Sequence, residues 1–289
     1  MPGTRRVAFL LCFAAMLRAS AAGAFCRKTT CSDCPVDPTT GCIEEGIPLA
    51  WPRACVSYAL TRVASRQIPL AEAKIIAAQA FQVWQSVRCP GTDSAPSIVT
   101  TDAFGVVECS LNEYNRGAGN ANIVTFRDDA WDHPDRDALG RTTMNFSEAT
   151  GEIFDADIEI NATNPLSTSP EVPADGWDLA SILTHEAGHF LGLAHSTVAD
   201  ATMNPYYRQG TDDFRTLSDD DVAGICAIYP PDRPALPCDF TPRGGFASEC
   251  ALGITAGGCA MGRGPAGSSA AGYAAIAAAL LLCARRRSA

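Results

Sequence analysis

The chain is predicted to fold as an α+β domain, with helices packed on a mixed, twisted sheet. Residues 70–87 place apolar side chains at helical spacing, and several shorter stretches alternate in the way that strands do. A second helical stretch begins near residue 179. Strands and helices distributed along a chain in this manner are typical of α+β architecture, in which the helices cover the sheet.

The first part of the domain is expected to contain a strand, a long backing helix and two further strands. Val56–Leu60 alternates as a strand does, and short strand candidates follow at Ser97–Thr101 and Asn122–Phe126. Pro69 suits the start of the helix, and Pro90 is expected to stop it. We expect its apolar stripe to consist of Ile75, Ala78, Phe81, Val83, Trp84 and Val87.

A β-hairpin is predicted from Thr142–Phe146 and Ile153–Ile160, turning at residues 149–151. Residues 161–178 are rich in Asn, Pro and Ser and are expected to form a loop. Asp178 then provides an N-cap for the helix that starts directly after it. At the last helix, Ser218 is the expected N-cap and, with Asp221 three residues on, forms a short capping box.

Three carboxylates alternate along the second strand of the hairpin, at Asp155, Asp157 and Glu159. Side chains two residues apart lie on one face of a strand, where three negative charges repel unless a cation or water screens them. Asp157 and Glu159 are therefore candidate calcium ligands, and a solvated strand face is the alternative. Five aspartates lie in a loop between residues 128 and 137, and for them the same two alternatives stay open, calcium ligands or solvated carboxylates.

Residues 185–195 read HEAGHFLGLAH and carry the chemistry of the chain. His185 and His189 are four apart, so on a helix they lie one turn apart on one face and can reach one metal ion. Glu186 is turned away from that pair and can instead act as a general base towards a metal-bound water. Gly192 suits a sharp helix end that brings His195 to the same metal. Three protein ligands and one open position are typical of catalytic zinc.

The distribution of histidines supports a metal site. A bare HExxH pattern also occurs in helices that bind nothing, so the pattern alone is weak. The whole chain has four histidines, however, and only His133 lies outside this window. Histidines with separate structural roles would not cluster at ligand spacing, so we interpret the window as a zinc site.

The pattern HExxHxxGxxH followed by a methionine turn resembles the metzincin metallopeptidases. Met203 stands where that turn is expected, and Ser196 after the third histidine resembles the matrixin (matrix-metalloprotease-like) branch. The spacing of Met203, Pro205 and Tyr207, and the stretch LSDDDVAGICAIYP at 217–230, are also similar to matrixins. The resemblance covers about residues 47–231 and is strongest over 181–231.

The resemblance implies a zincin-like fold and a zinc endopeptidase acting on proteins or peptides. It implies that Met203 forms a hydrophobic base under the site and that Pro205 and Tyr207 line the substrate pocket. It also implies calcium and a structural zinc near the hairpin, but Phe154 stands where a histidine of that second zinc is expected. A non-catalytic, metal-containing surface adhesion module is the alternative function, and it would be marked by the loss of Glu186 or by an occluded cleft.

Composition limits the partners and the compartment. A net charge of −10 argues against nucleic acid as a partner, because a phosphate backbone requires a basic surface. The chain has 13 cysteines, and residues 1–24 resemble a secretory signal with arginines, an apolar run and small residues before a cleavage site after Ala24. We therefore expect an exported protein at the cell surface or outside the cell.

Disulfide bonds are the expected state of most cysteines. Removing Cys12 with the signal and setting aside Cys259 and Cys283 leaves ten, an even number in an exported chain. Cys31 and Cys34 also have the spacing of half a zinc knuckle, although no matching second pair exists. Two candidate pairs are Cys89 with Cys109 and Cys238 with Cys250.

The expected organisation is a signal peptide (1–24), a Cys-rich segment (25–46), a catalytic domain (47–231), a Pro/Gly-rich stalk (232–258) and a tail (259–289). The tail contains a cysteine, an apolar stretch that is short for a membrane span, and terminal arginines. It resembles the C-terminal sorting signals of myxobacterial surface proteins, which implies cleavage and anchoring near Cys259. A simple membrane anchor is the alternative.

Overall fold

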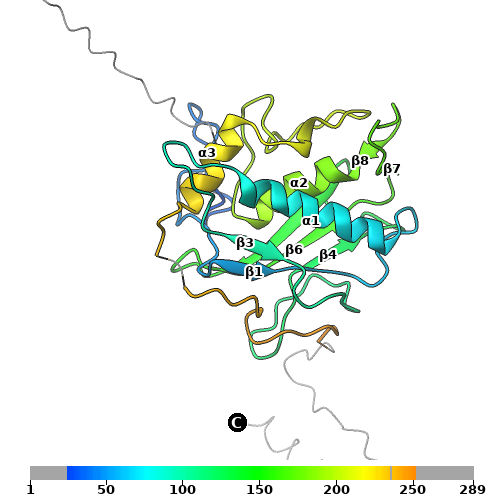
Figure 1. Ribbon diagram of the computed structural model, residues 1–289, viewed down its shortest axis with the longest axis horizontal. Helices are drawn as coiled ribbons and strands as arrows, with labels where there is room; N and C mark the ends of the chain where they lie inside the picture. The colour runs from blue at the N-terminus through cyan, green and yellow to red at the C-terminus, as the bar shows by residue number, and fades with distance from the viewer. Residues whose placement is uncertain (1–24, 235, 252–289) are drawn as a thin grey trace, which may run out of the picture. The chain divides into compact units, whose positions relative to one another are not determined.

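The structure is a computed structural model that describes residues 25–234 and 236–251 (Figure 1). In chain order its elements are β1 (Cys55–Ser57), β2 (Ala59–Leu60), α1 (Leu70–Ser86), β3 (Val99–Thr101), β4 (Ile123–Phe126), β5 (Gly140–Phe146), β6 (Ile153–Ile160), β7 (Leu166–Ser167), β8 (Trp177–Asp178), α2 (Leu179–Phe190), the 3-10 helix η1 (Asp213–Arg215) and α3 (Asp219–Ile228). The predicted α+β class is confirmed.

The sheet is mixed, with one antiparallel strand at its edge. Four strands lie in the order β2-β4-β6-β5, and β1 pairs with β3. Only Tyr58 separates β1 from β2, so these two strands continue one another and join the pairs into one surface. The contacts β1–β3, β2–β4 and β4–β6 are parallel, whereas β5 and β6 form the predicted antiparallel hairpin. The outer strand β5 therefore has a free edge.

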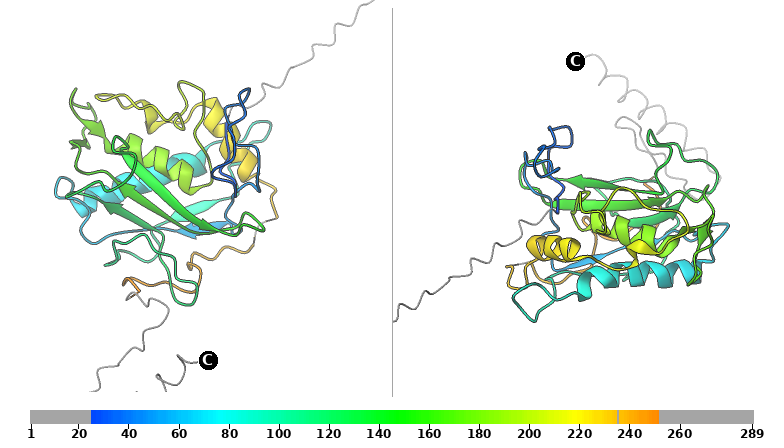
Figure 2. Two further views of the ribbon diagram at one scale, coloured as in Figure 1. Left: turned by 180° about the vertical axis from the view of Figure 1, so that it is seen from behind. Right: turned by 90° about the horizontal axis from the view of Figure 1, so that it is seen from above.

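Both long helices lie on the same side of the sheet (Figure 2). The helix α2 is packed between α1 and the strands β5 and β6, which buries it on several sides. The indole of Trp84 from α1 is fully buried and donates to the backbone carbonyl of Thr184 in α2 at 2.8 Å. A large buried aromatic side chain with a satisfied N–H fixes the two helices against each other.

The predicted helix over 70–87 is present, but its predicted apolar stripe is partly wrong. Ile75 is 59% exposed, while its neighbour Ile76 is 8% exposed and belongs to the core. Three alanines and the large side chains of Phe81 and Trp84 make up the rest of the buried face. The buried residues of α1 are Ala73, Ile76, Ala77, Ala80, Phe81 and Trp84.

All ten cysteines expected to form disulfides do so, but both candidate pairs are wrong. The bonds are Cys26–Cys42, Cys31–Cys34, Cys55–Cys238, Cys89–Cys226 and Cys109–Cys250. Cys89 follows α1 at the point where the chain runs beside the end of α3, and the N–H of Ser97 donates to the carbonyl of Tyr229 there at 2.9 Å. In three of these five bonds, Cys55–Cys238, Cys89–Cys226 and Cys109–Cys250, tertiary packing therefore joins cysteines that are far apart in the sequence.

The segment after α3 runs back along the domain. Arg53 forms a β-bridge with Leu236, and Asn120 forms one with Phe246. Within the predicted stalk (232–258), the structure describes residues 232–234 and 236–251, and Leu236 and Phe246 pair there with earlier parts of the chain. The predicted signal peptide (1–24), the rest of the stalk and the tail (259–289) lie outside the described residues. None of the helices within residues 25–234 and 236–251 is long and apolar enough to cross a membrane.

Candidate metal centre and active-site cleft

The helix α2 carries two of the three predicted metal ligands and has well-defined ends. The carboxylate of Asp178 accepts a hydrogen bond from the N–H of Ser181 at 2.8 Å, as the predicted N-cap requires. The helix ends before Gly192, whose φ of +97° only glycine adopts readily. A Cβ at this position would also lie 2.8 Å from the carbonyl oxygen of Leu49. The chain turns here and returns His195 towards the helix.

The three histidines of the motif converge on one point. Their candidate ligand atoms all lie within 4.8 Å of one another, and the Nε2 atoms of His189 and His195 are 3.2 Å apart. The Nδ1 atoms of His185 and His189 lie 2.7 Å from the carbonyl of Thr202 and 2.9 Å from that of Leu193. Because a carbonyl only accepts, each Nδ1 carries the proton and each Nε2 presents a lone pair.

This arrangement fits a zinc ion. Burial lowers the pKa of His195 to about 3 and lowers those of His185 and His189, so the three rings are neutral, as metal ligands must be. Two lone pairs that face each other repel unless a cation lies between them. Tetrahedral zinc with nitrogen ligands at about 2.0–2.1 Å separates those nitrogens by about 3.3–3.4 Å, close to the separation between His189 and His195.

Glu186 lines the same cleft as the three histidines and follows His185 directly on α2. It is 4% exposed, and its Oε2 accepts a hydrogen bond from the hydroxyl of Thr142 on β5 at 2.6 Å. Burial raises the pKa of Glu186 to about 7, against the opposing effects of Thr142 and the positive charge of Lys28. A carboxyl whose pKa lies near neutrality can both accept and donate a proton. Gly140 is required nearby, because a Cβ there would lie 2.7 Å from Oε1 of Glu186.

The predicted methionine turn lies under the helix. Met203 is 1% exposed, and its sulfur occupies the space that a side chain at Gly188 would need. The carboxylate of Asp221 on α3 accepts hydrogen bonds from the N–H groups of Thr202 at 2.7 Å and Met203 at 3.0 Å. Since the carbonyl of Thr202 also orients His185, the turn links α3 to the metal centre.

An open cleft of about 740 Å³ runs along β5 and α2 and contains the motif. Pro205 and Tyr207 line it, and so does Tyr206, which is 85% exposed. The ring of Tyr207 packs against those of Trp177 and Phe214, with centroids 5.8 and 5.0 Å apart. The cleft thus has an aromatic wall on the side of the methionine turn.

The carboxylates of β6 are buried, so the alternative of a solvated strand face is wrong. Asp155, Asp157 and Glu159 are 0%, 1% and 4% exposed. Glu159 forms an ion pair with Arg127 at 2.6 Å, which balances its charge without a metal. Asp155 and Asp157 have no ion pair among the described residues, and the Oδ1 of Asp155 has no hydrogen-bond partner there. Burial raises the pKa of Asp155 to about 7 and that of Asp157 well above its usual value.

Several residues of the cleft were not predicted from the sequence. Thr142 falls in the predicted hairpin, but no local signal places it against Glu186. His133, the histidine outside the motif, lines the same cleft together with Trp131, and their rings pack 4.4 Å apart. Lys28 from the Cys-rich segment lines it as well. These residues come from segments whose position depends on tertiary packing.

Comparisons with known proteins agree with this geometry. A family model described as matrixin matches residues 50–230. The hatching enzyme of Paracentrotus lividus is 47% identical over 152 residues, which are 52% of this chain and 21% of that protein. Metalloendoproteinase 1-MMP of Arabidopsis thaliana is 30% identical over 191 residues, or 65% of this chain and 46% of that protein. Human matrix metalloproteinase-20 is 29% identical over 158 residues, which are 49% of this chain and 32% of that protein.

The matched region contains the sheet, both long helices, the methionine turn and α3, so it spans the whole metal centre. The chain spans less than half of the length of each of these relatives. The family model nevertheless covers more than half of the chain, and the three histidines, the glycine turn and Met203 lie in it in the expected arrangement. The chain belongs to the matrixin family.

Proposed function

We propose that the chain is a zinc-dependent endopeptidase that hydrolyses peptide bonds in proteins or peptides. The observation that carries this proposal is the convergence of the three imidazoles with a buried carboxylate in an open cleft. His185, His189 and His195 hold the metal, and Glu186 acts as the general base. The names of the relatives support this activity, because they are described as metalloendoproteinases and a matrix metalloproteinase.

In this mechanism each group of the chain has a separate task. Zinc, when bound, polarises the scissile carbonyl and lowers the pKa of water. Glu186 accepts a proton from the attacking water and returns it to the nitrogen of the leaving amine. Thr142 orients the Glu186 carboxylate through its hydroxyl. The free edge of β5 pairs with the extended substrate backbone. Pro205 and Tyr207 contact the substrate side chain that follows the cut bond.

The rival function, a non-catalytic adhesion module, lacks support from the site. Its expected marks were the loss of Glu186 or an occluded cleft. Glu186 is present beside the histidines, and the cleft is open. A metal used only for binding would also not require a carboxylate with a pKa near 7 next to it.

Zinc analysis combined with peptide digestion tests the proposal. Purified protein should contain one zinc ion, and it should cleave internal bonds in a mixture of blocked peptides. A chelator should abolish the cleavage, and added zinc should restore it. Cleavage that is indifferent to chelation, or zinc-loaded protein that cleaves none of the peptides, would refute the proposed function.

We also propose that the protein is exported and processed at both ends. The support is the signal-like composition of residues 1–24 and the five disulfide bonds, which persist in oxidising compartments. In this proposal the Cys-rich segment precedes the catalytic domain, and the tail 259–289 directs anchoring in the cell envelope. Intact mass spectrometry of protein from its native cells should find the chain starting at Phe25 and ending near Cys259. An intact tail would contradict the sorting proposal.

A further inference from the structure

The Cys-rich segment forms part of the wall of the active-site cleft. Lys28 is held by two backbone hydrogen bonds: its N–H donates to the carbonyl of Gly192 at 2.9 Å, and its carbonyl accepts from the N–H of Leu49 at 2.8 Å. The N–H of Ala194 donates to the carbonyl of Cys26 at 2.9 Å. The segment therefore pairs with the turn between the second and third histidines.

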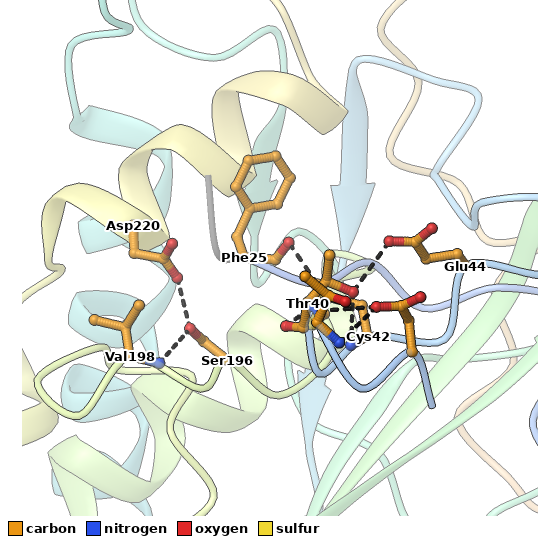
Figure 3. The surroundings of a disulfide bond; sticks show 10 residues. Phe25, Thr40, Cys42, Glu44, Ser196, Val198 and Asp220 are labelled. Carbon is orange, nitrogen blue, oxygen red and sulfur yellow. Dashed lines mark hydrogen bonds between the residues drawn. A yellow bond between two sulfur atoms is a disulfide. The ribbon is translucent and has the colours of Figure 1, made fainter. Parts of the chain in front are cut away.

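Disulfide bonds keep this segment in place. Cys26–Cys42 closes a loop that contains Lys28, and Cys31–Cys34 follows Lys28 within that loop. Figure 3 shows the first of these bonds beside the loop that follows His195, where the hydroxyl of Ser196 donates to the carboxylate of Asp220 at 2.7 Å. The backbone of Lys28 is thus fixed relative to the metal centre by the folded chain itself.

The side chain of Lys28 brings a positive charge into the cleft. It lines the cleft together with the three histidines and Glu186, and it has no ion pair among the described residues. Burial lowers the pKa of its ammonium, the charge of Glu186 opposes this, and Arg141 adds to it. Arg141 lines the same cleft, where its guanidinium is 3.4 Å from Nδ1 of His133. Two cationic side chains, Lys28 and Arg141, therefore line the cleft, together with the carboxylates of Glu186, Asp135 and Asp137.

A half-buried cation without a counterion is costly, and the cost is removed when a ligand supplies the anion. Glu186 cannot serve as a permanent partner, because it is hydrogen-bonded to Thr142 and has to exchange protons during hydrolysis. Within an extended peptide whose ends lie outside the cleft, the anionic groups are the side chains of Asp and Glu. The cleft thus offers an acidic residue of the substrate a site beside the metal centre.

We propose that Lys28 is a specificity-determining residue that binds an acidic side chain of the substrate close to the scissile bond. The inference rests on the proposed endopeptidase function, which it deepens by naming the substrate class. Because Lys28 belongs to the Cys-rich segment, this segment takes part in substrate binding. A hydrogen bond to a charged group corresponds to a preference of about tenfold or more for an acidic over a neutral residue.

Pairs of fluorogenic peptides test this directly. Both ends of each peptide are blocked, and the members of a pair differ only by Glu or Gln at one of the positions that flank the cut bond. The full zinc-loaded chain should show a ratio of kcat/KM for Glu over Gln of about ten or more at one position. Lys28→Met, which keeps the aliphatic stem, should bring this ratio to about one while the Gln peptide is still cleaved. Lys28→Glu should favour Lys over Gln at the same position.

The chain supplies a matched control in its only other lysine. Lys74 on α1 pairs with Asp102 at 2.6 Å outside the cleft, so Lys74→Met should keep the wild-type ratio. Lys28→Gln and Lys28→Arg provide a comparison that is independent of the methionine variant: arginine should retain the preference, and glutamine should lose it.

The outcomes separate the two proposals. A wild-type ratio near one at every position, or a preference that survives in Lys28→Met or Lys28→Gln, would overturn the role of Lys28. A preference lost in Arg141→Met but kept in Lys28→Met would assign the site to Arg141 and equally overturn it. If zinc-loaded wild type cleaves none of the peptides, the endopeptidase function itself fails.

Discussion

Glu186 is 4% exposed at the lining of the cleft, and its carboxylate accepts a hydrogen bond from the hydroxyl of Thr142 at 2.6 Å. Its neighbours on the helix are histidines whose Nδ1 atoms are tied to backbone carbonyls. Glu186, His185 and His189 are thus each oriented by a group that takes no part in the proposed reaction. Orientation of this kind matters because small displacements of a base or a ligand lower the rate steeply.

Replacing Glu186 by Gln should remove the base and leave the rest of the site in place. Glutamine has nearly the same volume and still accepts the hydrogen bond from Thr142. Because general base catalysis contributes about 10²–10⁴-fold, kcat/KM should fall by that factor while the zinc content is unchanged. Retention of more than a tenth of the wild-type activity in a zinc-loaded variant would exclude Glu186 as the base.

Replacing Thr142 by Val should reduce activity without removing the base. The variant loses the donor that orients Glu186, and a hydrogen bond to a charged group contributes about 1.5–3 kcal/mol, so kcat should fall about tenfold or more. Thr143→Val on the same strand is the matched control, since the hydroxyl of Thr143 lies 3.5 Å from the amide of Asn112 instead. Equal activity of the two variants in steady-state assays would show that Thr142 does not position Glu186.

At the scale of elements, β6 shows a conflict between its sequence and its position. The strand is central and buried, yet it carries Asp155 and Asp157 without a cationic partner among the described residues. Their pKa values are raised because burial disfavours the charged form. A bound cation would relieve this, and a carboxyl oxygen of Asp155 without a hydrogen-bond partner is a natural ligand.

The stability of the protein should report this conflict through its pH dependence. The folded state binds the proton of Asp155 more tightly than the unfolded chain does. The stabilisation that this proton gives to the folded state is therefore fully present below the usual pKa of 3.8 and is lost as the pH rises to about 7. Asp155→Asn should therefore gain stability relative to calcium-free wild type over this range. Urea unfolding at several pH values measures the difference, and added calcium should narrow it. A difference that does not vary with pH would contradict the raised pKa.

The ends of the helices could be predicted from sequence, because their signals are local. Asp178 caps α2, and Ser218 forms the predicted capping box with Asp221. Gly192 adopts the expected positive φ, so the return of His195 to the site follows from the motif. The buried face of α1 follows the helical period more closely than the predicted stripe did. Ile75 precedes Trp84 by nine residues, about two and a half turns, and so lies on the opposite side of the helix, whereas Ile76 lies towards the buried side.

At the scale of the whole molecule, the sequence could not indicate which distant segments meet. Thr142 contacts Glu186, and Lys28 lines the same cleft, from separate parts of the chain whose positions depend on how the segments pack around α2. The same holds for the disulfides: Cys89 pairs with Cys226, 137 residues away, and not with Cys109, the candidate partner nearer in the sequence. The pairing of distant cysteines is determined by the tertiary fold, and the local composition of the sequence does not indicate it.

The contribution of each disulfide to stability should follow the length of chain that it closes. Cys89–Cys226 spans 137 residues and joins the end of α1 to α3, whereas Cys31–Cys34 spans three. Restricting the unfolded chain is worth about 5 kcal/mol for the long loop and about 2 kcal/mol for the short one. Replacing both cysteines of a pair by Ala should therefore lower the free energy of unfolding much more for Cys89 and Cys226, as measured by urea titration. Equal losses would mean that the long bond acts mainly on the folded state, through the packing of α1 against α3.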